Sequence, residues 1–124
     1  MIGLEFKEVS VIEEAYAKIN LFLEVLGKRE DGYHGIRSVM QTVSLHDTVN
    51  VRLSESGISM TCSTPALDCG ASNLCIKAAK AFSSACGGVG AEITLTKVIP
   101  MQAGLGGGSA DAAAVLRAMN FLCG

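Results

Sequence analysis

Four closely spaced glycines, Gly104, Gly106, Gly107 and Gly108, stand directly before Ser109 near the end of the chain. Glycine adopts backbone conformations that other residues rarely reach, and it lets another group approach the main chain closely. An alanine-rich run with helical spacing follows. The glycines therefore lead into a helix start, where free N–H groups and the helix dipole favour negative charge. This pattern predicts a phosphate-binding loop.

Two familiar phosphate motifs do not match this loop. No lysine precedes Ser109, which excludes the pattern GxxxxGK[ST], and Ser109 takes the place of the third glycine of the dinucleotide pattern GxGxxG. The structural alternative is a flexible turn between a strand and a core helix. Four glycines make the turn softer than a mere connection requires, so we favour phosphate binding.

Lys18 and Asn20 form a second candidate pair. Every odd position from 15 to 25 is apolar: Ala15, Ala17, Ile19, Leu21, Leu23 and Val25. Because successive strand residues point to opposite faces, Lys18 and Asn20 are expected to project side by side from the other face. The alternative is a solvated lysine on the open face of a sheet, and the pattern alone favours it.

Tyr33 and His34 form a third candidate pair, directly after the hairpin signal Asp31-Gly32. A histidine on a loop is usually just solvated. A tyrosine beside a histidine at a loop tip can instead stack on a ring and hydrogen-bond its edge. The pair is therefore a candidate for binding an aromatic ring.

The composition indicates one globular domain. The 124 residues are 49% apolar and 18% charged, enough for one core and too few for two domains. A net charge of −2 and the absence of tryptophan argue against a nucleic-acid-binding protein. No apolar run reaches the length of a membrane span, and the N-terminal residues are too acidic for a targeting peptide, so we expect a cytoplasmic protein. Five cysteines without CxxC spacing predict free, largely buried thiols.

Residue periodicity places the elements that must position these candidates. Strands are expected over 4–12, 15–25, 36–45, 48–54, 58–63 and 91–97, and helices over 74–86 and from about 110 onward. A turn is expected at His46-Asp47, and Ser72 or Asn73 is expected to cap the first helix. The last helix is expected to bury Ala112, Val115, Leu116, Met119 and Leu122. Strands followed by helices predict an α+β domain with a mixed or antiparallel sheet and helices packed on one face.

Two long stretches carry a family resemblance. They read AYAKINLFLEVLGKREDGYHGIRSVMQTVSLHD, over 15–47, and IPMQAGLGGGSADAAAVLRAMN, over 99–120. Together they resemble the GHMP small-molecule kinases, whose N-terminal domain has the ribosomal protein S5 domain 2-like fold. The combination of AKINL and DGYH is similar to the branch that phosphorylates a cytidine diphosphate-linked alcohol in the non-mevalonate route to isoprenoid precursors.

The resemblance implies an ATP site and a substrate site. It implies that the phosphates of ATP are wrapped by Gly104, Leu105, Gly106, Gly107, Gly108 and Ser109, with Ser109 near the phosphates or their Mg²⁺. It implies that Asn73, Lys97 and Pro100 lie at the nucleotide, Asn73 and Lys97 lining the adenine pocket. On the substrate side it implies that Lys18 lies beside the phosphate-accepting hydroxyl. Asn20 would then position the substrate, and Tyr33 and His34 would bind the cytosine ring.

Family members are much longer than this chain. Their GxDxPF segment, which carries the proposed catalytic base, and their second domain have no counterpart in residues 1–124. We therefore expect an N-terminal ATP-binding domain without the C-terminal GHMP domain, inactive alone. Asp111 is not that base, and we expect it to act in the first turn of the helix through its charge at the N-terminus or through a hydrogen bond. The alternatives are another GHMP kinase, acting on homoserine, mevalonate or a sugar, and a non-catalytic binding or assembly domain of the same fold.

Overall fold

The structure is a computed structural model that describes residues 9–28, 30, 32, 34–101 and 107–124. Its elements, in chain order, are β1 (Ser10–Lys28), β2 (His34–Ser54), β3 (Ile58–Cys62), α2 (Leu74–Ala85), β4 (Gly90–Thr96) and α3 (Gly107–Cys123). The strands form one sheet in the order β1-β2-β4-β3. Neighbours pair antiparallel except β3 and β4, which are parallel.

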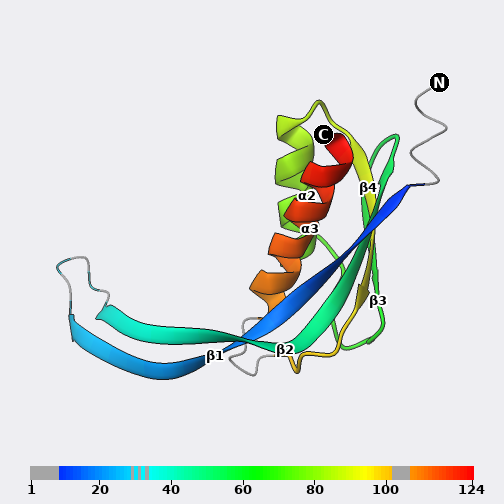
Figure 1. Ribbon diagram of the computed structural model, residues 1–124. Helices are drawn as coiled ribbons and strands as arrows, with labels where there is room; N and C mark the ends of the chain where they lie inside the picture. The colour runs from blue at the N-terminus through cyan, green and yellow to red at the C-terminus, as the bar shows by residue number, and fades with distance from the viewer. Residues whose placement is uncertain (1–8, 29, 31, 33, 102–106) are drawn as a thin grey trace.

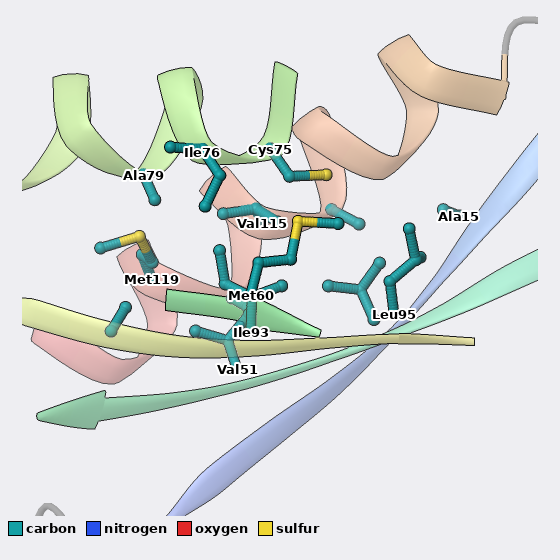
Figure 2. Close-up of a cluster of buried hydrophobic side chains, with 14 residues drawn as sticks. Ala15, Val51, Met60, Cys75, Ile76, Ala79, Ile93, Leu95, Val115 and Met119 are labelled. Carbon is teal, nitrogen blue, oxygen red and sulfur yellow. The ribbon is translucent and has the colours of Figure 1, made fainter. Parts of the chain in front are cut away.

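Both helices lie on the same face of this mixed sheet, as Figure 1 shows. Alternation along the strands explains the packing: Val49 and Val51 of β2 pair with Leu95 and Ile93 of β4, and all four side chains are buried. Met119 of α3 belongs to the same cluster, which Figure 2 shows between the helices and the sheet. The predicted fold class is therefore confirmed.

Helix α2 has the start and stop signals that its sequence suggests. Asn73 is the N-cap of α2, one of the two residues expected there, and its side chain accepts a hydrogen bond from the N–H of Cys75. After α2, Gly87 and Gly88 adopt φ values of 83° and 85°, which glycine tolerates best. These two glycines turn the chain from α2 into β4.

The predicted turn at His46-Asp47 is wrong, because β2 runs unbroken through both residues. The irregularity takes another form: the β1–β2 register shifts between Tyr16 and Lys18, where β2 has more residues than β1. Such a bulge bends a strand without ending it. Asp47 therefore lies inside a strand, where its side chain is fully buried.

The apolar face predicted for β1 is only partly a core face. Ala15 and Ala17 are buried under the helices, whereas Leu21 and Val25 are 61% and 62% exposed. Figure 1 gives the reason: β1 and β2 continue past the ends of the helices as a two-stranded ribbon. The helices do not reach that far, so the alternation there has no core to face.

Two further expectations need correction. Helix α3 begins at Gly107, three residues before the predicted start, and it buries Val115 and Met119 as expected but leaves Leu116 40% exposed. The cysteines are free, yet only Cys75 is buried. Among the described residues, no helix is both long enough and apolar enough to cross a bilayer.

Candidate functional site

The described part of the glycine motif lies at the start of α3, beside the start of α2. A Cβ added to Gly108 would lie 3.7 Å from Cδ1 of Leu74, the first residue of α2. Figure 1 shows the two helices running side by side in the same direction. Two helix N-termini thus meet at one end of the helical layer, and the partial positive charges of both favour an anion there.

Gly107 packs directly on the chain beneath it. A Cβ at this position would lie 2.9 Å from Nζ of Lys97 and 3.1 Å from Cγ2 of Ile99, closer than ordinary van der Waals contact. A side chain at Gly108 would meet only the ordinary contact with Leu74. The first residue of α3 must therefore be small because of what lies under it.

A buried ionic triad lies under Gly107. Lys97, one residue after β4, places Nζ 2.7 Å from Oδ2 of Asp47 in β2 and 3.1 Å from Oδ2 of Asp111 in α3. The other carboxylate oxygen of Asp47 accepts the backbone N–H groups of Val98 and Ile99, at 2.6 and 2.8 Å. The triad thus joins β2, the connection after β4, and α3 just after its first turn.

The three charges respond differently to burial. Burial tends to lower the pKa of Lys97, but its hydrogen bonds to the two carboxylates outweigh that effect and raise it. Burial opposes ionisation of Asp47 too, yet the hydrogen bonds from Asp111, Lys97 and the backbone N–H groups hold its pKa below the usual range. Burial first, and then neighbouring Asp47, raise the pKa of Asp111 to about 7 although Lys97 opposes the shift. Asp47 is therefore the firmly ionised partner.

Lys18 lies half-buried in β1, paired with Thr42, directly after the bulge at Tyr16. Regular pairing then holds as far as Asn20, which is exposed and lies opposite Met40, before a second register shift. This regular segment leaves Lys18 and Asn20 two positions apart on one strand face, as the alternation predicts. Bulges are frequent next to active sites, where they re-aim side chains.

The residues expected at the nucleotide have structural partners of their own. The amide oxygen of Asn73 caps α2, and its Nδ2 donates to the carbonyl of Asp68 at 2.8 Å. The ammonium of Lys97 belongs to the triad, and its backbone N–H donates to Oγ of Ser63 at 2.8 Å. Pro100 and Ser109 are exposed.

Several predicted site residues lie outside the described part of the chain. They are Gly104, Leu105 and Gly106, and also Tyr33, which stands between β1 and β2 in the sequence. His34 is described only as the first residue of β2, where its backbone pairs with Lys28. Their proposed roles therefore rest on the sequence.

The triad carboxylates are the part of the site that sequence reasoning missed. Asp47 was assigned to a turn and Asp111 to the helix end, but both patterns held a signal. Asp47 stands two positions before Val49 on the inward-facing parity of β2. Asp111 stands three and four positions before the buried Ala114 and Val115 of α3. An acidic residue in phase with a buried stripe predicts a buried ion pair.

Residues that could hold a metal are few in this region. Among the described residues, no group of three or more His, Cys, Asp or Glu side chains is arranged to bind a metal ion. The exposed hydroxyl of Ser109 in the first turn of α3 can still serve a Mg²⁺ ion that is held mainly by phosphate oxygens and water. The residues present fit a metal that arrives with a nucleotide.

Comparison with known proteins places this arrangement in a class of enzymes. Residues 73–124 match the family model described as the GHMP kinases N terminal domain. The matched segment begins at the cap of α2 and includes β4 and α3, so it contains both helix starts and two members of the triad. The resemblance to GHMP kinases that the motifs predicted is thereby confirmed.

More specific relatives share one name. The chain is 51% identical over 109 residues to the 4-diphosphocytidyl-2-C-methyl-D-erythritol kinase of Desulfitobacterium hafniense, covering 87% of this chain and 37% of that protein. It is 50% identical over 107 residues to the kinase of the same name from Clostridium kluyveri, covering 86% of this chain and 38% of that protein. The chain thus spans less than two-fifths of the length of these two relatives.

Solved structures agree with this placement. A crystal structure of 4-(cytidine 5'-diphospho)-2C-methyl-D-erythritol kinase matches with a TM-score of 0.81 and 42% identity, over 90% of this chain and 40% of that one. The homoserine kinase of Cytophaga hutchinsonii matches with a TM-score of 0.70 at 24% identity, over 93% of this chain and 36% of that one. The second likeness is one of fold alone.

Proposed function

We propose that this chain is the ATP-binding part of a kinase that phosphorylates the 2-hydroxyl of 4-diphosphocytidyl-2-C-methyl-D-erythritol. The observation that carries the proposal is the start of α3 at Gly107 and Gly108, beside the start of α2, within a chain about half identical to kinases of that name. Helix N-termini bind phosphate through backbone N–H groups and the helix dipole. The phosphates of ATP would lie at the start of α3, on the glycine motif.

Each remaining residue has a role in this proposal. Ser109 faces the phosphates with its hydroxyl, and Mg²⁺ would neutralise charge on the transferred group. Asn73, Lys97 and Pro100 lie at the adenosine end, where Lys97 contributes backbone and alkyl atoms because its ammonium is held by two carboxylates. Asn73 contributes its position at the start of α2 while its amide remains the helix cap.

In this proposal, the alcohol that accepts the phosphoryl group binds at the β1–β2 ribbon. Lys18 and Asn20 lie on one face of β1, so the lysine can stabilise charge on the transferred phosphoryl group while the amide orients the alcohol. Tyr33 and His34, just before and at the start of β2 in the sequence, would bind the cytosine ring. Phosphoryl transfer depends mainly on such positioning and charge neutralisation.

The matched region is only part of each of the two relatives. These relatives are more than twice as long as that region. We therefore propose that the 124-residue chain binds nucleotide but does not turn over. A coupled ADP-release assay with the cytidyl alcohol should stay at background, and turnover above background would contradict this part of the proposal.

Calorimetric titration with a non-hydrolysable ATP analogue and Mg²⁺ tests the nucleotide site. We expect one site per chain, and a folded chain that binds no analogue would refute it. Parallel titrations with the cytidyl alcohol, homoserine and mevalonate test the substrate branch. Binding of the cytidyl alcohol alone is expected, whereas binding of homoserine or mevalonate instead would move the chain to another branch of the superfamily.

A further inference from the structure

Asp111, the acidic residue that follows the first turn of α3, faces inward. An acid at this place on a helix is usually exposed and interacts with the helix dipole from outside. Asp111 is only 2% exposed, and its Oδ2 reaches Nζ of Lys97 at 3.1 Å. Its carboxylate therefore serves a contact beneath the helix.

This contact is one link in a chain of fixed groups. Lys97 lies against Gly107, since a Cβ there would come within 2.9 Å of its Nζ. Lys97 is held in turn by Asp47, whose second oxygen accepts the N–H groups of Val98 and Ile99. The position of the start of α3 thus depends on the ionic contact between Asp111 and Lys97, and on the contact between Lys97 and Asp47.

General stability is a weak explanation for such a group. Replacing buried ion pairs by apolar side chains of similar volume is often neutral or stabilising. In addition, Oδ1 of Asp111 is buried without a hydrogen-bond partner among the described residues. A residue that served stability alone would be better replaced by an apolar one. The ionic arrangement differs from apolar packing in accepting only a narrow range of geometries.

We infer that Asp111, just after the first turn of α3, is a positioning residue that fixes the start of this helix against the sheet through Lys97 and Asp47. The positioning itself is argued from the contacts alone. Only its consequence, that the helix start is held in place to bind an anion, rests on the proposed function. The fixed turn presents its backbone N–H groups in one orientation, which preorganises the site for phosphate.

Amide hydrogen exchange of the 124-residue chain tests the positioning directly, without any ligand. The reporters are the amides of 111–115, which close the first turns of α3, and those of 119–122 near its end serve as internal reference. In Asp111→Ala we expect the first-turn amides to exchange roughly tenfold faster while the reference amides stay within about twofold of wild type. Alanine is the better helix former, so helix propensity predicts the opposite change.

Asp111→Asn is the matched control. Asparagine keeps the shape and one oxygen acceptor for Lys97, so its first-turn exchange should stay within about threefold of wild type. Equal acceleration of first-turn and reference amides in Asp111→Ala would mean loss of global stability and would overturn the inference, as would no change in either set. If the alanine variant does not fold, Asp111→Glu decides. It keeps the charge but displaces the carboxylate by one methylene, and unchanged first-turn exchange would overturn the inference.

Titration with the ATP analogue adds the functional readout. We expect Asp111→Ala to bind roughly tenfold more weakly than wild type and Asp111→Asn within about threefold, because only the first loses the anchored turn. Wild-type affinity in the alanine variant would overturn the inference. If wild type binds no analogue, the proposed function fails, and the exchange experiment alone still decides the positioning role.

Discussion

The two helix starts at the candidate site are built in different ways. α2 begins with a side-chain cap. The side-chain oxygen of Asn73 accepts a hydrogen bond from the N–H of Cys75 at 2.8 Å, and its Nδ2 donates to the carbonyl of Asp68. α3 begins on Gly107 and Gly108, and its first buried side chain, Asp111, turns inward to an ammonium. The start of α2 is capped by a side chain, whereas the start of α3 is fixed by a contact between a buried carboxylate and the ammonium of Lys97.

This difference separates a structural helix end from a candidate ligand-binding end. A cap that satisfies its own N–H groups leaves less for a ligand, while a helix start supported from underneath keeps its outer side available. Glycine contributes in two ways here. Gly107 allows close packing on Lys97, and Gly108 is exposed beside α2. Substitutions that disturb one start and not the other can therefore test the comparison.

The largest effect is expected from Lys97→Met, which leaves the carboxylates of Asp47 and Asp111 buried without a cation. Removing one partner of a buried ion pair costs roughly 3–5 kcal/mol. Urea denaturation monitored by circular dichroism should show this loss in the free energy of unfolding. Lys80→Met, on the exposed side of α2, is the control and should change it by less than about 0.5 kcal/mol. Similar values for the two variants would show that the triad is not a coupled unit.

A pH effect of similar size is expected from Asp111. Its pKa is raised to about 7 in the folded chain, so the folded state holds this proton more tightly than the unfolded state does. Stability should therefore fall as pH rises from about 4 to 7, by roughly 4 kcal/mol at most from this group. Asp111→Asn should flatten that part of the curve. An unchanged slope in the variant would assign the pH dependence to other groups.

Asp47 makes stability depend on pH in the opposite direction. Its pKa is lowered in the folded chain, so it stabilises the fold above its unfolded pKa, and that contribution is lost as pH falls through the folded value. Acid should therefore weaken the triad through Asp47 at lower pH than the range in which Asp111 titrates. The two carboxylates can be told apart by repeating the pH series with the asparagine variant.

Gly107→Ala sharpens the comparison within one motif. Its Cβ would lie 2.9 Å from Nζ of Lys97 and 3.1 Å from Ile99, so the variant should lose roughly 1–3 kcal/mol of unfolding free energy. Gly108→Ala is the control, because its Cβ meets only Leu74 at 3.7 Å and alanine favours the helix by up to about 1 kcal/mol. Urea denaturation of both variants measures the difference. Equal destabilisation would mean that the close packing at Gly107 is not what requires glycine.

The smallest effect is expected at the other helix start. Asn73→Ala removes the cap of α2 and should cost about 1 kcal/mol in the same unfolding measurement. Asn73→Asp, which keeps a capping oxygen, should recover most of it. A loss as large as that of Lys97→Met would show that the two starts are not built as differently as the contacts indicate.

The sequence predicted much of the fold because, in most strands, alternating apolar side chains do face the core. Ile93 and Leu95 of β4 point inward as expected, and α2 lies close to its predicted bounds. The apolar alternation of β1 was misleading beyond Ala17, since no helix covers the ribbon. Periodicity shows that a strand has an apolar face but does not show how far the covering layer extends.

The sequence predicted the kind of site, a helix start suited to phosphate, but not the buried ion pairs beneath it. The glycine motif pointed to a helix start, and the structure places Gly107 and Gly108 there. Asp47 was read as a turn residue because aspartate is common in turns. Its actual partner, Lys97, lies fifty positions away in the chain, a contact that local pattern cannot reveal. Asp47 lies two positions before the buried Val49, which indicates that its side chain faces the core. Only the folded structure shows that its partner is Lys97.

We propose that the phosphates bind at the start of α3 and not at that of α2. Titrating the ¹⁵N-labelled chain with magnesium tripolyphosphate, which has phosphates but no adenosine, tests it most directly by NMR. The account predicts that the amide signals of Gly107, Gly108 and Ser109 shift in a saturable way, while those of Cys75 and Ile76 in the first turn of α2 stay in place. Shifts confined to the α2 amides, or saturation without any change at 107–109, would contradict it.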